Sequence, residues 1–218
     1  RLFEETKGLR VQIPSGPFMF LKVYESLLKK FGNQKWWPMN GRFEPKELEV
    51  CIGAILTQNT NWKNVERALE NLINAKILTA EKIANMHLSS IEKLIMSSGF
   101  YKQKAKRLKE FCRFIVNFKG DFYKDVTREQ LLSINGIGRE TADSILLYAC
   151  NKPFFVVDAY TQRIFSKLGL INEEDDYEKI RELFESNLPC DVELYKEFHA
   201  LIVRLGKEKN IDSFLSLE

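Results

Sequence analysis

Residues 131–142 restrict the fold of this chain more than any other segment. They run Leu-Leu-Ser-Ile-Asn-Gly-Ile-Gly-Arg-Glu-Thr-Ala, which predicts the end of a short helix, a tight turn at two glycines and the start of a second helix. The first turn of a helix has unpaired N–H groups and the positive end of the helix dipole. Gly136 and Gly138 would let that backbone approach a phosphate closely. The segment is therefore either a plain turn between core helices or a sequence-independent grip on a nucleic-acid strand.

Helical periodicity dominates the remainder of the chain. Apolar residues recur at steps of three and four, and Asn61, Thr79, Thr127 and Asp158 stand where helix N-caps belong. A glutamine three residues after Thr127 completes a capping box. Residues 153–157 resemble a strand, but a single strand has no partner, so the prediction is an all-α fold. The expected helices cover residues 18–31, 45–56, 62–74, 80–86, 90–97, 102–118, 127–133, 138–149, 158–168, 177–187 and 192–209.

Composition is that of an ordinary globular protein. Of the 218 residues, 44% are hydrophobic and 29% are charged, which suffices for one large domain or two small lobes with a core. No apolar run is long enough to cross a bilayer, and the first residues do not resemble a signal peptide. We therefore expect a cytoplasmic protein without a membrane partner. Because the first residue is Arg1, we expect the natural start to lie upstream.

The net charge of +3 neither shows nor excludes binding to nucleic acid, because a local patch matters more than the sum. A basic run covers residues 102–113, and an acidic run covers residues 173–176. Each run is read as a solvated surface, with phosphate contacts as the alternative for the basic one. The basic residues are Lys102, Lys104, Lys106, Arg107, Lys109 and Arg113.

Cysteine and histidine are too few and too scattered for most metal sites. No two cysteines form a C-x-x-C pair, and no histidine stands at ligand spacing from a cysteine, so the sequence predicts no zinc site and no iron–sulfur cluster. Two histidines also argue against a histidine-based nucleophilic triad. The residues are Cys51, Cys112, Cys150, Cys190, His87 and His199.

Residues 134–142, Ile-Asn-Gly-Ile-Gly-Arg-Glu-Thr-Ala, resemble the helix-hairpin-helix of the endonuclease III superfamily of DNA glycosylases. The motif of that superfamily runs Leu-Pro-Gly-Val-Gly-Arg-Lys-Thr-Ala. Three further blocks agree with it in the same order: residues 55–62, residues 98–108, and the apolar run that leads to Asp158. Together the four blocks extend the resemblance over about residues 36–169.

The resemblance implies a bilobal, all-α helix-hairpin-helix fold with the active site in the cleft between two helical lobes. Residues 45–150 would form a central domain that ends in the hairpin, and residues 16–44 with 151–210 would form the second lobe. We expect the segments before residue 10 and after residue 210 to be loosely held. The partner that the resemblance implies is double-stranded DNA with a damaged base. That base must leave the duplex to reach the cleft. We expect the protein to be a monomer that is associated with the nucleoid.

Asp158 is the catalytic residue that the resemblance implies. Breaking an N-glycosidic bond builds positive charge on the sugar, which a fixed carboxylate stabilises, and the same carboxylate can orient or deprotonate water. The alternative is that Asp158 only caps its helix. Glu140 stands where members with lyase activity carry a lysine, and a carboxylate cannot form a Schiff base. The chain is therefore predicted to be a monofunctional glycosylase that leaves an abasic site.

The remaining candidate residues are those expected to bind the DNA strand, the extruded base or a cofactor. Gln58 is expected to fill the gap left by the extruded base. The DNA-binding candidates are Gln58, Asn59, Gly136, Gly138, Arg139 and Thr141, and the base-pocket candidates are Trp36, Trp37 and Pro38. The tryptophans resemble a branch that includes 3-methyladenine DNA glycosylases; their rings would attract a cationic base, or else they belong to the core. Many relatives carry an iron–sulfur loop of four cysteines near the C-terminus, whereas residues 207–218 contain no cysteine, so either this branch lacks the cluster or the sequence has been cut short; we expect no cluster. A monovalent cation on hairpin carbonyls near Ile134 and Ile137 stays open.

The leading functional prediction is thus a base-excision-repair DNA N-glycosylase for an alkylated purine such as 3-methyladenine. The alternatives are a glycosylase for oxidised pyrimidine, uracil or mismatched thymine, and a DNA-binding helical module without catalysis. A scaffold for protein partners would leave Gly136, Gly138 and Asp158 unexplained together.

Overall fold

The structure is a computed structural model that describes residues 17–208. Within this range the chain is helical and contains no strand, so the all-α prediction is confirmed. Residues 153–157 run as extended chain without a partner strand. The expectations for the segments before residue 10 and after residue 210, and the predicted boundaries at 16, 209 and 210, lie outside the described residues. No described helix combines the length and the apolar character needed to cross a membrane.

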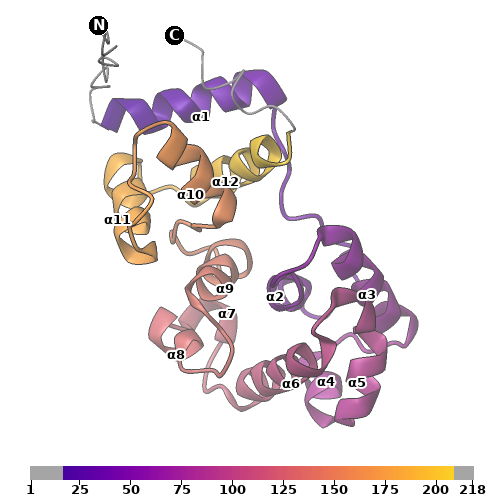
Figure 1. Ribbon diagram of the computed structural model, residues 1–218. Coiled ribbons are helices and arrows are strands. Elements are labelled where there is room, and N and C mark those ends of the chain that lie inside the picture. Colours follow the sequence, from indigo (N-terminus) through magenta and orange to yellow (C-terminus); the bar gives the residue numbers. More distant parts are fainter. Residues whose placement is uncertain (1–16, 209–218) are drawn as a thin grey trace, which may run out of the picture.

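The helices gather into two groups (Figure 1). One group holds α2 (Glu47–Leu56), α3 (Trp62–Asn74), α4 (Ala80–Asn85), α5 (Leu88–Leu94), η1 (Met96–Ser98), α6 (Tyr101–Asn117), α7 (Phe122–Asp125), α8 (Arg128–Leu132), α9 (Arg139–Ser144) and η2 (Ile145–Ala149). The other holds α1 (Pro17–Phe31), α10 (Ala159–Lys167), α11 (Tyr177–Asn187) and α12 (Val192–Gly206). Helix α1 packs on α11 and α12, so the N-terminal helix joins the C-terminal part of the chain. We retain the division at residues 45 and 150 as a proposal.

The four predicted N-caps accept hydrogen bonds from the first turns of their helices. The side chains of Asn61, Thr79 and Asp158 accept from the N–H groups three residues ahead, and Thr127 forms the complete capping box. Helix α2 differs from the prediction because it begins at Glu47, and Pro45 lies in a turn before it. The short helix α7 was not predicted.

The predicted helix over residues 138–149 changes its hydrogen-bond pattern halfway. Residues Ile145–Ala149 form a π-helical turn, in which the Cys150 N–H donates to the Ile145 carbonyl five residues back. Such turns insert one extra residue and redirect the side chains that follow. The turn packs on α12 of the other lobe and carries Tyr148.

An aromatic core holds the second lobe together. The rings of Phe20, Phe165, Phe184 and Phe198 pack against one another, and Phe155 joins them by stacking on Phe184 with ring centroids 4.1 Å apart. Because Phe155 is buried in this core, it anchors the extended segment that leads to the start of α10.

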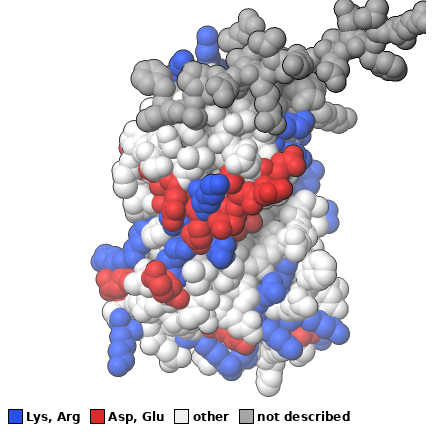
Figure 2. Space-filling view, turned by 60° about the vertical axis from the view of Figure 1, so that its left-hand side comes forward, with Lys and Arg blue, Asp and Glu red and all other residues white. Residues whose placement is uncertain are grey.

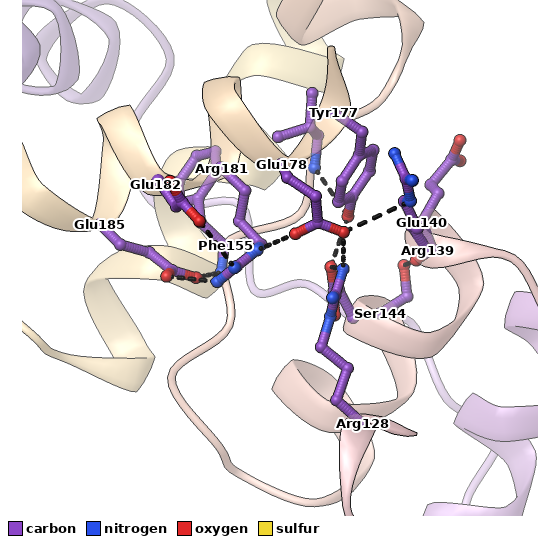
Figure 3. Close-up of polar contacts among 12 residues, drawn as sticks. Arg128, Arg139, Glu140, Ser144, Phe155, Tyr177, Glu178, Arg181, Glu182 and Glu185 are labelled. Carbon is purple, nitrogen blue, oxygen red and sulfur yellow. Dashed lines mark hydrogen bonds and ion pairs between the residues drawn. The ribbon is translucent and has the colours of Figure 1, made fainter. Parts of the chain in front are cut away.

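A polar junction joins the lobes on one side (Figure 3). Asp143 on α9 is fully buried and accepts two hydrogen bonds from Arg128, at 2.6 and 3.0 Å, and one from the Tyr177 hydroxyl at 2.8 Å. Arg128 also pairs with Glu178 on α11 at 2.8 Å. Because the buried carboxylate is fully paired, removing one partner would strand its charge, so the junction resists separation of α9 from α11.

Candidate active site

Residues from both lobes line a cavity of about 870 Å³. Its walls include every catalytic, DNA-binding and base-pocket candidate named from the sequence except Pro38, which is exposed and lies off the cavity. The candidates that line it are Asp158, Glu140, Gln58, Asn59, Gly136, Gly138, Arg139, Thr141, Trp36 and Trp37. Segments far apart in the sequence therefore meet at one place, and the role of each residue stays a prediction.

Asp158 is fixed at the start of α10. Its Oδ1 accepts hydrogen bonds from the Thr161 N–H at 2.8 Å and the Thr161 hydroxyl at 2.9 Å, and its side chain is 12% exposed. Burial alone would raise the pKa of the Asp158 carboxyl, but His199 and the Thr161 donors outweigh burial, so this pKa lies below its ordinary value. Capping uses one carboxylate oxygen, which leaves the other to act in the cavity. The geometry therefore allows capping and catalysis together.

The backbone of the hairpin turn requires a glycine at Gly136 but not at Gly138. Gly136 has φ of +83°, and a Cβ added there would collide with the Arg107 side chain. Gly138 has an ordinary φ of −88°, with open space where a side chain would stand. Gly136 is thus required by the turn itself, whereas the absence of a side chain at Gly138 keeps the start of α9 accessible from the cavity. The Ile134 carbonyl accepts the Ile137 N–H, and the cation near them stays a prediction.

Gln58 belongs to the hairpin side of the cavity rather than projecting freely. Its amide donates to the Gly136 carbonyl at 3.2 Å and to the Thr141 hydroxyl at 2.9 Å, and it accepts from Arg107 at 2.5 Å. Thr141 is buried, and its hydroxyl accepts the hydrogen bond from the Gln58 amide. Asn59, in contrast, is exposed and has a left-handed backbone with φ of +52°. The structure therefore brings Gln58 and Thr141 together and leaves Asn59 free to contact a partner.

Arg139 and Glu140 extend in different directions from the start of α9. The Arg139 side chain is 53% exposed and lies 3.4 Å from Glu178, at the edge of the polar junction. Figure 3 shows the Glu140 side chain extending away from that junction. Glu140 is exposed on the cavity side, but the atoms around it and then the charge of Asp158 raise the pKa of its carboxyl. No amine occupies this position.

Four aromatic residues, Trp36, Trp37, Trp62 and Tyr148, form what we call the aromatic wall. The three indole rings contact one another with centroids 5.4 to 5.9 Å apart, and Trp37 lies 5.1 Å from Tyr148. Within the described chain, the three indole N–H groups are buried without a hydrogen-bond partner. The three tryptophans also line the cavity, so they belong both to the core and to the site.

The loop that carries Trp36 and Trp37 is held at both ends. Before the tryptophans, the Gln34 N–H donates to Glu197 on α12 at 2.6 Å. After them, the N–H groups of residues 40 and 41 donate to the buried carboxylate of Glu49 on α2, at 2.7 and 2.9 Å. The two glutamates therefore fix the position of the aromatic wall from opposite lobes.

One prediction about the basic run is wrong. Lys104 cannot contact a phosphate, because it is 1% exposed and its ammonium donates to the carbonyls of Leu56 and Ser98, at 2.8 and 2.7 Å. These carbonyls end α2 and η1, where the helix dipole favours a cation. Burial, and then the charge of Arg107, lowers the pKa of Lys104 to about 8. Lys104 thus ties the loop of Gln58 to the turn of residues 99–100.

Three residues of the cavity region were missed from the sequence. Trp62 stands only four residues after Gln58, and as the third tryptophan of the chain it offered a weak signal. Tyr148 depends on the π-helical turn, which has no recognisable pattern. His199 was set aside with His87 as one of only two histidines, yet its Nε2 lies 3.7 Å from the Asp158 carboxylate. Only contacts between distant helices reveal the last two.

The cysteines do not fit an iron–sulfur cluster. Cys51, Cys112 and Cys150 are buried in the core, where burial raises the pKa of each thiol, and Cys190 is exposed. Among the described residues, no three His, Cys, Asp or Glu side chains gather as metal ligands would. A cluster needs thiolates that converge on one point, so no step of the chemistry is assigned to one here.

Comparison with known proteins gives consistent relationships. Residues 52–190 match the sequence profile of the HhH-GPD superfamily of base excision DNA repair proteins. A protein of Methanocaldococcus jannaschii, provisionally named a DNA repair glycosylase, is 53% identical over 198 residues, which cover 87% of this chain and 88% of the relative. Endonuclease III of Thermotoga maritima is 31% identical over 173 residues, which cover 79% of this chain and 78% of the relative.

Two solved structures share the fold. The H. pylori 3-methyladenine DNA glycosylase bound to 1,N6-ethenoadenine has a TM-score of 0.77 and 37% identity, over 89% of this chain and 99% of that protein. A trapped endonuclease III–DNA covalent intermediate has a TM-score of 0.76 and 19% identity, over 90% of each chain, which shows the fold alone. These matches confirm the predicted bilobal helical fold and the resemblance on which it rested.

Proposed function

Because the chain belongs to the HhH-GPD superfamily of base excision DNA repair proteins and is a DNA glycosylase of that family, we propose that it removes alkylated purines by hydrolysis, without a covalent DNA intermediate. One observation carries the proposal. Asp158 and Glu140 line the same cavity as Trp36, Trp37 and Trp62, and Glu140 rather than an amine stands where lyase members carry lysine.

The proposed reaction needs little beyond a fixed carboxylate. A nucleotide extruded from the duplex enters the cavity, and the bond between its sugar carbon and the base nitrogen breaks with both electrons going to the base. Asp158 stabilises the positive charge that develops on the sugar and accepts a proton from the water that attacks the same carbon. The products are a free base and an abasic site. The Asp158 carboxylate then returns its proton to solvent.

The aromatic wall suits a cationic base. An alkylated purine such as 3-methyladenine carries positive charge, and the faces of Trp36, Trp37 and Trp62 attract a flat cation. Positive charge also makes the base a good leaving group, so strong general-acid help is unnecessary. The related H. pylori enzyme is named for 3-methyladenine, which supports this substrate class.

The distribution of charge favours one approach for DNA. Figure 2 shows Asp and Glu side chains gathered in a band across one face, with a few basic residues among them. Helix α11 lies on the side that this view brings forward, and the exposed acidic residues of α11 and of the turn before it are Glu173, Glu174, Asp176 and Glu182. Phosphates are repelled from such a surface. We therefore propose that double-stranded DNA reaches a monomeric protein from the hairpin and α6.

On that approach, Gly136, Gly138 and Arg139 would hold phosphates, and Gln58 and Asn59 would contact the strand at the extruded nucleotide. The exposed basic residues Lys102, Lys106 and Arg113 of α6 would add salt-dependent contacts.

A second candidate, a glycosylase for oxidised pyrimidine, uracil or mismatched thymine, is favoured by the relationship to endonuclease III. The test is release of 3-methyladenine from methylated DNA under single-turnover conditions, with duplexes that carry each alternative base in parallel. We expect released 3-methyladenine, strand cleavage only after alkali, and no protein–DNA adduct after borohydride. A trapped adduct would contradict the hydrolytic mechanism, and release of another base alone would replace the substrate.

A further inference from the structure

His199 is a buried polar residue that the proposed reaction does not yet use. It lies on α12, is 6% exposed and lines the cavity beside Asp158. Its Nε2 is 3.7 Å from Oδ2 of Asp158 and has no hydrogen-bond partner among residues 17–208. A buried polar atom without a partner is costly, so its direction toward the carboxylate calls for an explanation.

The other ring nitrogen of His199 is occupied. Its Nδ1 lies 2.6 Å from the Tyr148 hydroxyl, which is also 3.2 Å from the Lys196 carbonyl. Burial, and then the charges of Asp158 and Glu197, raise the pKa of Tyr148, so the hydroxyl keeps its proton. A hydroxyl has one hydrogen to donate: the Lys196 carbonyl can only accept it, Nδ1 can accept it or donate its own hydrogen, and the shorter contact is the one to Nδ1.

The proton on the ring follows from this contact. If Nδ1 accepts the Tyr148 hydrogen, a neutral imidazole carries its own proton on Nε2, which faces Asp158. The reverse tautomer would place a bare nitrogen lone pair against an ionised carboxylate, which is repulsive. The 3.7 Å gap exceeds a hydrogen bond, and such contacts often tighten only in the substrate complex.

We propose that His199 is a positioning residue for Asp158, with its Nε2–H holding Oδ2 and with the Tyr148 hydroxyl setting its tautomer. Thr161 already holds Oδ1, so the carboxylate is then fixed at both oxygens before the sugar arrives. A group held in place needs no reorganisation as charge develops, which is what makes a fixed carboxylate effective. The inference rests on the proposed function, in which Asp158 acts on the sugar.

The π-helical turn and α12 come from different lobes, so the contact between Tyr148 and His199 also couples the lobes beneath the cavity. The charged groups around the pair are Asp158 and Glu140 from the cavity and Glu197 from α12. Only Asp158 is placed to accept from Nε2.

The kinetic test uses three variants and a control. We expect His199→Leu to lower the single-turnover rate of base release roughly 10- to 100-fold, the range for a hydrogen bond to a charged group, while DNA affinity and melting temperature change little. His199→Gln restores an N–H donor and should recover most of the rate, and Tyr148→Phe should fall between. In an Asp158→Asn background His199→Leu should have no further effect. His87→Gln, at the other and exposed histidine, is the control.

A second measurement does not depend on the substrate. Because the chain has two histidines, nitrogen NMR of the imidazoles separates His199 from His87. We expect a protonated Nε2 and an unprotonated Nδ1 on His199, and we expect Tyr148→Phe to move part of that proton to Nδ1. A bare Nε2 in the wild type, or a wild-type rate in His199→Leu, would overturn the inference. Absence of base release by the wild type with a protonated Nε2 would instead count against the proposed substrate alone.

Discussion

The hairpin turn and the Asp158 cap are each formed within one short stretch of chain, whereas the aromatic wall is assembled from segments scattered along the sequence. On the hairpin side, the turn at Gly136 and the cap at Asp158 are set by hydrogen bonds within a few residues. The wall needs a loop held by Glu49 and Glu197, a helix start at Trp62 and a π-helical turn. The backbone and one oxygen of the catalytic carboxylate are thus placed locally, and the surface for the base is placed by tertiary structure.

This difference leads to an expectation about mutations. Changes at Asp158 should act on the rate of base release and leave binding largely intact. Changes at the tryptophans of the aromatic wall or in the supports of their loop should act on affinity for the extruded base and on stability together, because the same rings belong to the core.

The largest expected effect tests the local side of the comparison. Asp158→Asn should lower base release on the order of 10²- to 10³-fold, the loss seen when one preorganised electrostatic group is removed. The asparagine oxygen can still accept from the Thr161 N–H, so folding and DNA binding should persist. Single-turnover release and an equilibrium binding assay measure the two parts.

The matched control is Asp176→Asn, which changes another N-cap aspartate, at the start of α11. Its side chain accepts from the Lys179 N–H, and it does not line the cavity. If both variants lost base release equally, loss of a helix cap rather than loss of chemistry would explain the effect of Asp158→Asn. Separate roles for the hairpin side and the aromatic wall would then be contradicted.

The same difference explains how much could be predicted from the sequence. The N-caps at Asn61, Thr79 and Thr127 were predicted correctly because a cap is a contact within one turn. The hairpin and its position before α9 followed from the two glycines for the same reason. The all-α class followed from periodicity, which local sequence also carries.

Features that depend on distant contacts were missed or misread. Lys104 belongs to a basic run and was expected at the surface. It is buried, and its ammonium donates hydrogen bonds to the carbonyls of Leu56 and Ser98, at the ends of α2 and η1. Tyr148 and His199 come together through a π-helical turn and a contact between lobes, neither of which has a pattern in the sequence. The sequence leaves open whether Trp36 and Trp37 belong to the core or to the base pocket. In the structure they pack against the core and also line the cavity.

The next effect tests the aromatic wall directly. Trp37→Ala should weaken binding of damaged DNA about 10-fold, because stacking on an aromatic ring contributes about 1–3 kcal/mol per base. Affinity for undamaged duplex should hardly change, since no base is extruded there. The melting temperature should fall as well, because Trp37 packs on Gly53 and Tyr148. Equal losses on damaged and undamaged DNA would place Trp37 outside base recognition.

A smaller effect is expected at a support of the wall. Glu49→Ala would remove the charged acceptor of two partly buried hydrogen bonds from backbone N–H groups, at a cost of about 1–3 kcal/mol. The loop of Trp36 and Trp37 should loosen, and damaged-DNA affinity should drop a few-fold without a change in the rate of the bound complex. Glu193→Gln, whose side chain is 83% exposed, serves as the control. A lower rate of base release at saturating protein would show that the aromatic wall and the hairpin side do not act separately.

The smallest effect concerns Lys104, which supports the loop of Gln58 on the hairpin side. Its pKa is lowered to about 8 from 10.5 by burial and then by Arg107, so the folded protein binds this proton less tightly than the unfolded chain does. Between these two values the unfolded state holds more protons, and stability gained from Lys104 rises with pH. Below pH 8 the cost of burying the charge is fully present, although both hydrogen bonds are made.

Lys104→Met removes the titration and both hydrogen bonds but keeps most of the buried volume. We expect the variant to be less stable at pH 7, and its deficit in unfolding free energy to grow between pH 8 and pH 10 as the wild type alone gains. Denaturant unfolding of both proteins across this range measures the difference. Loss of the bond to Leu56 should also loosen Gln58 and weaken DNA binding slightly. A deficit that is constant with pH would mean that Lys104 keeps an ordinary pKa, and that the carbonyls and nearby water solvate its charge fully.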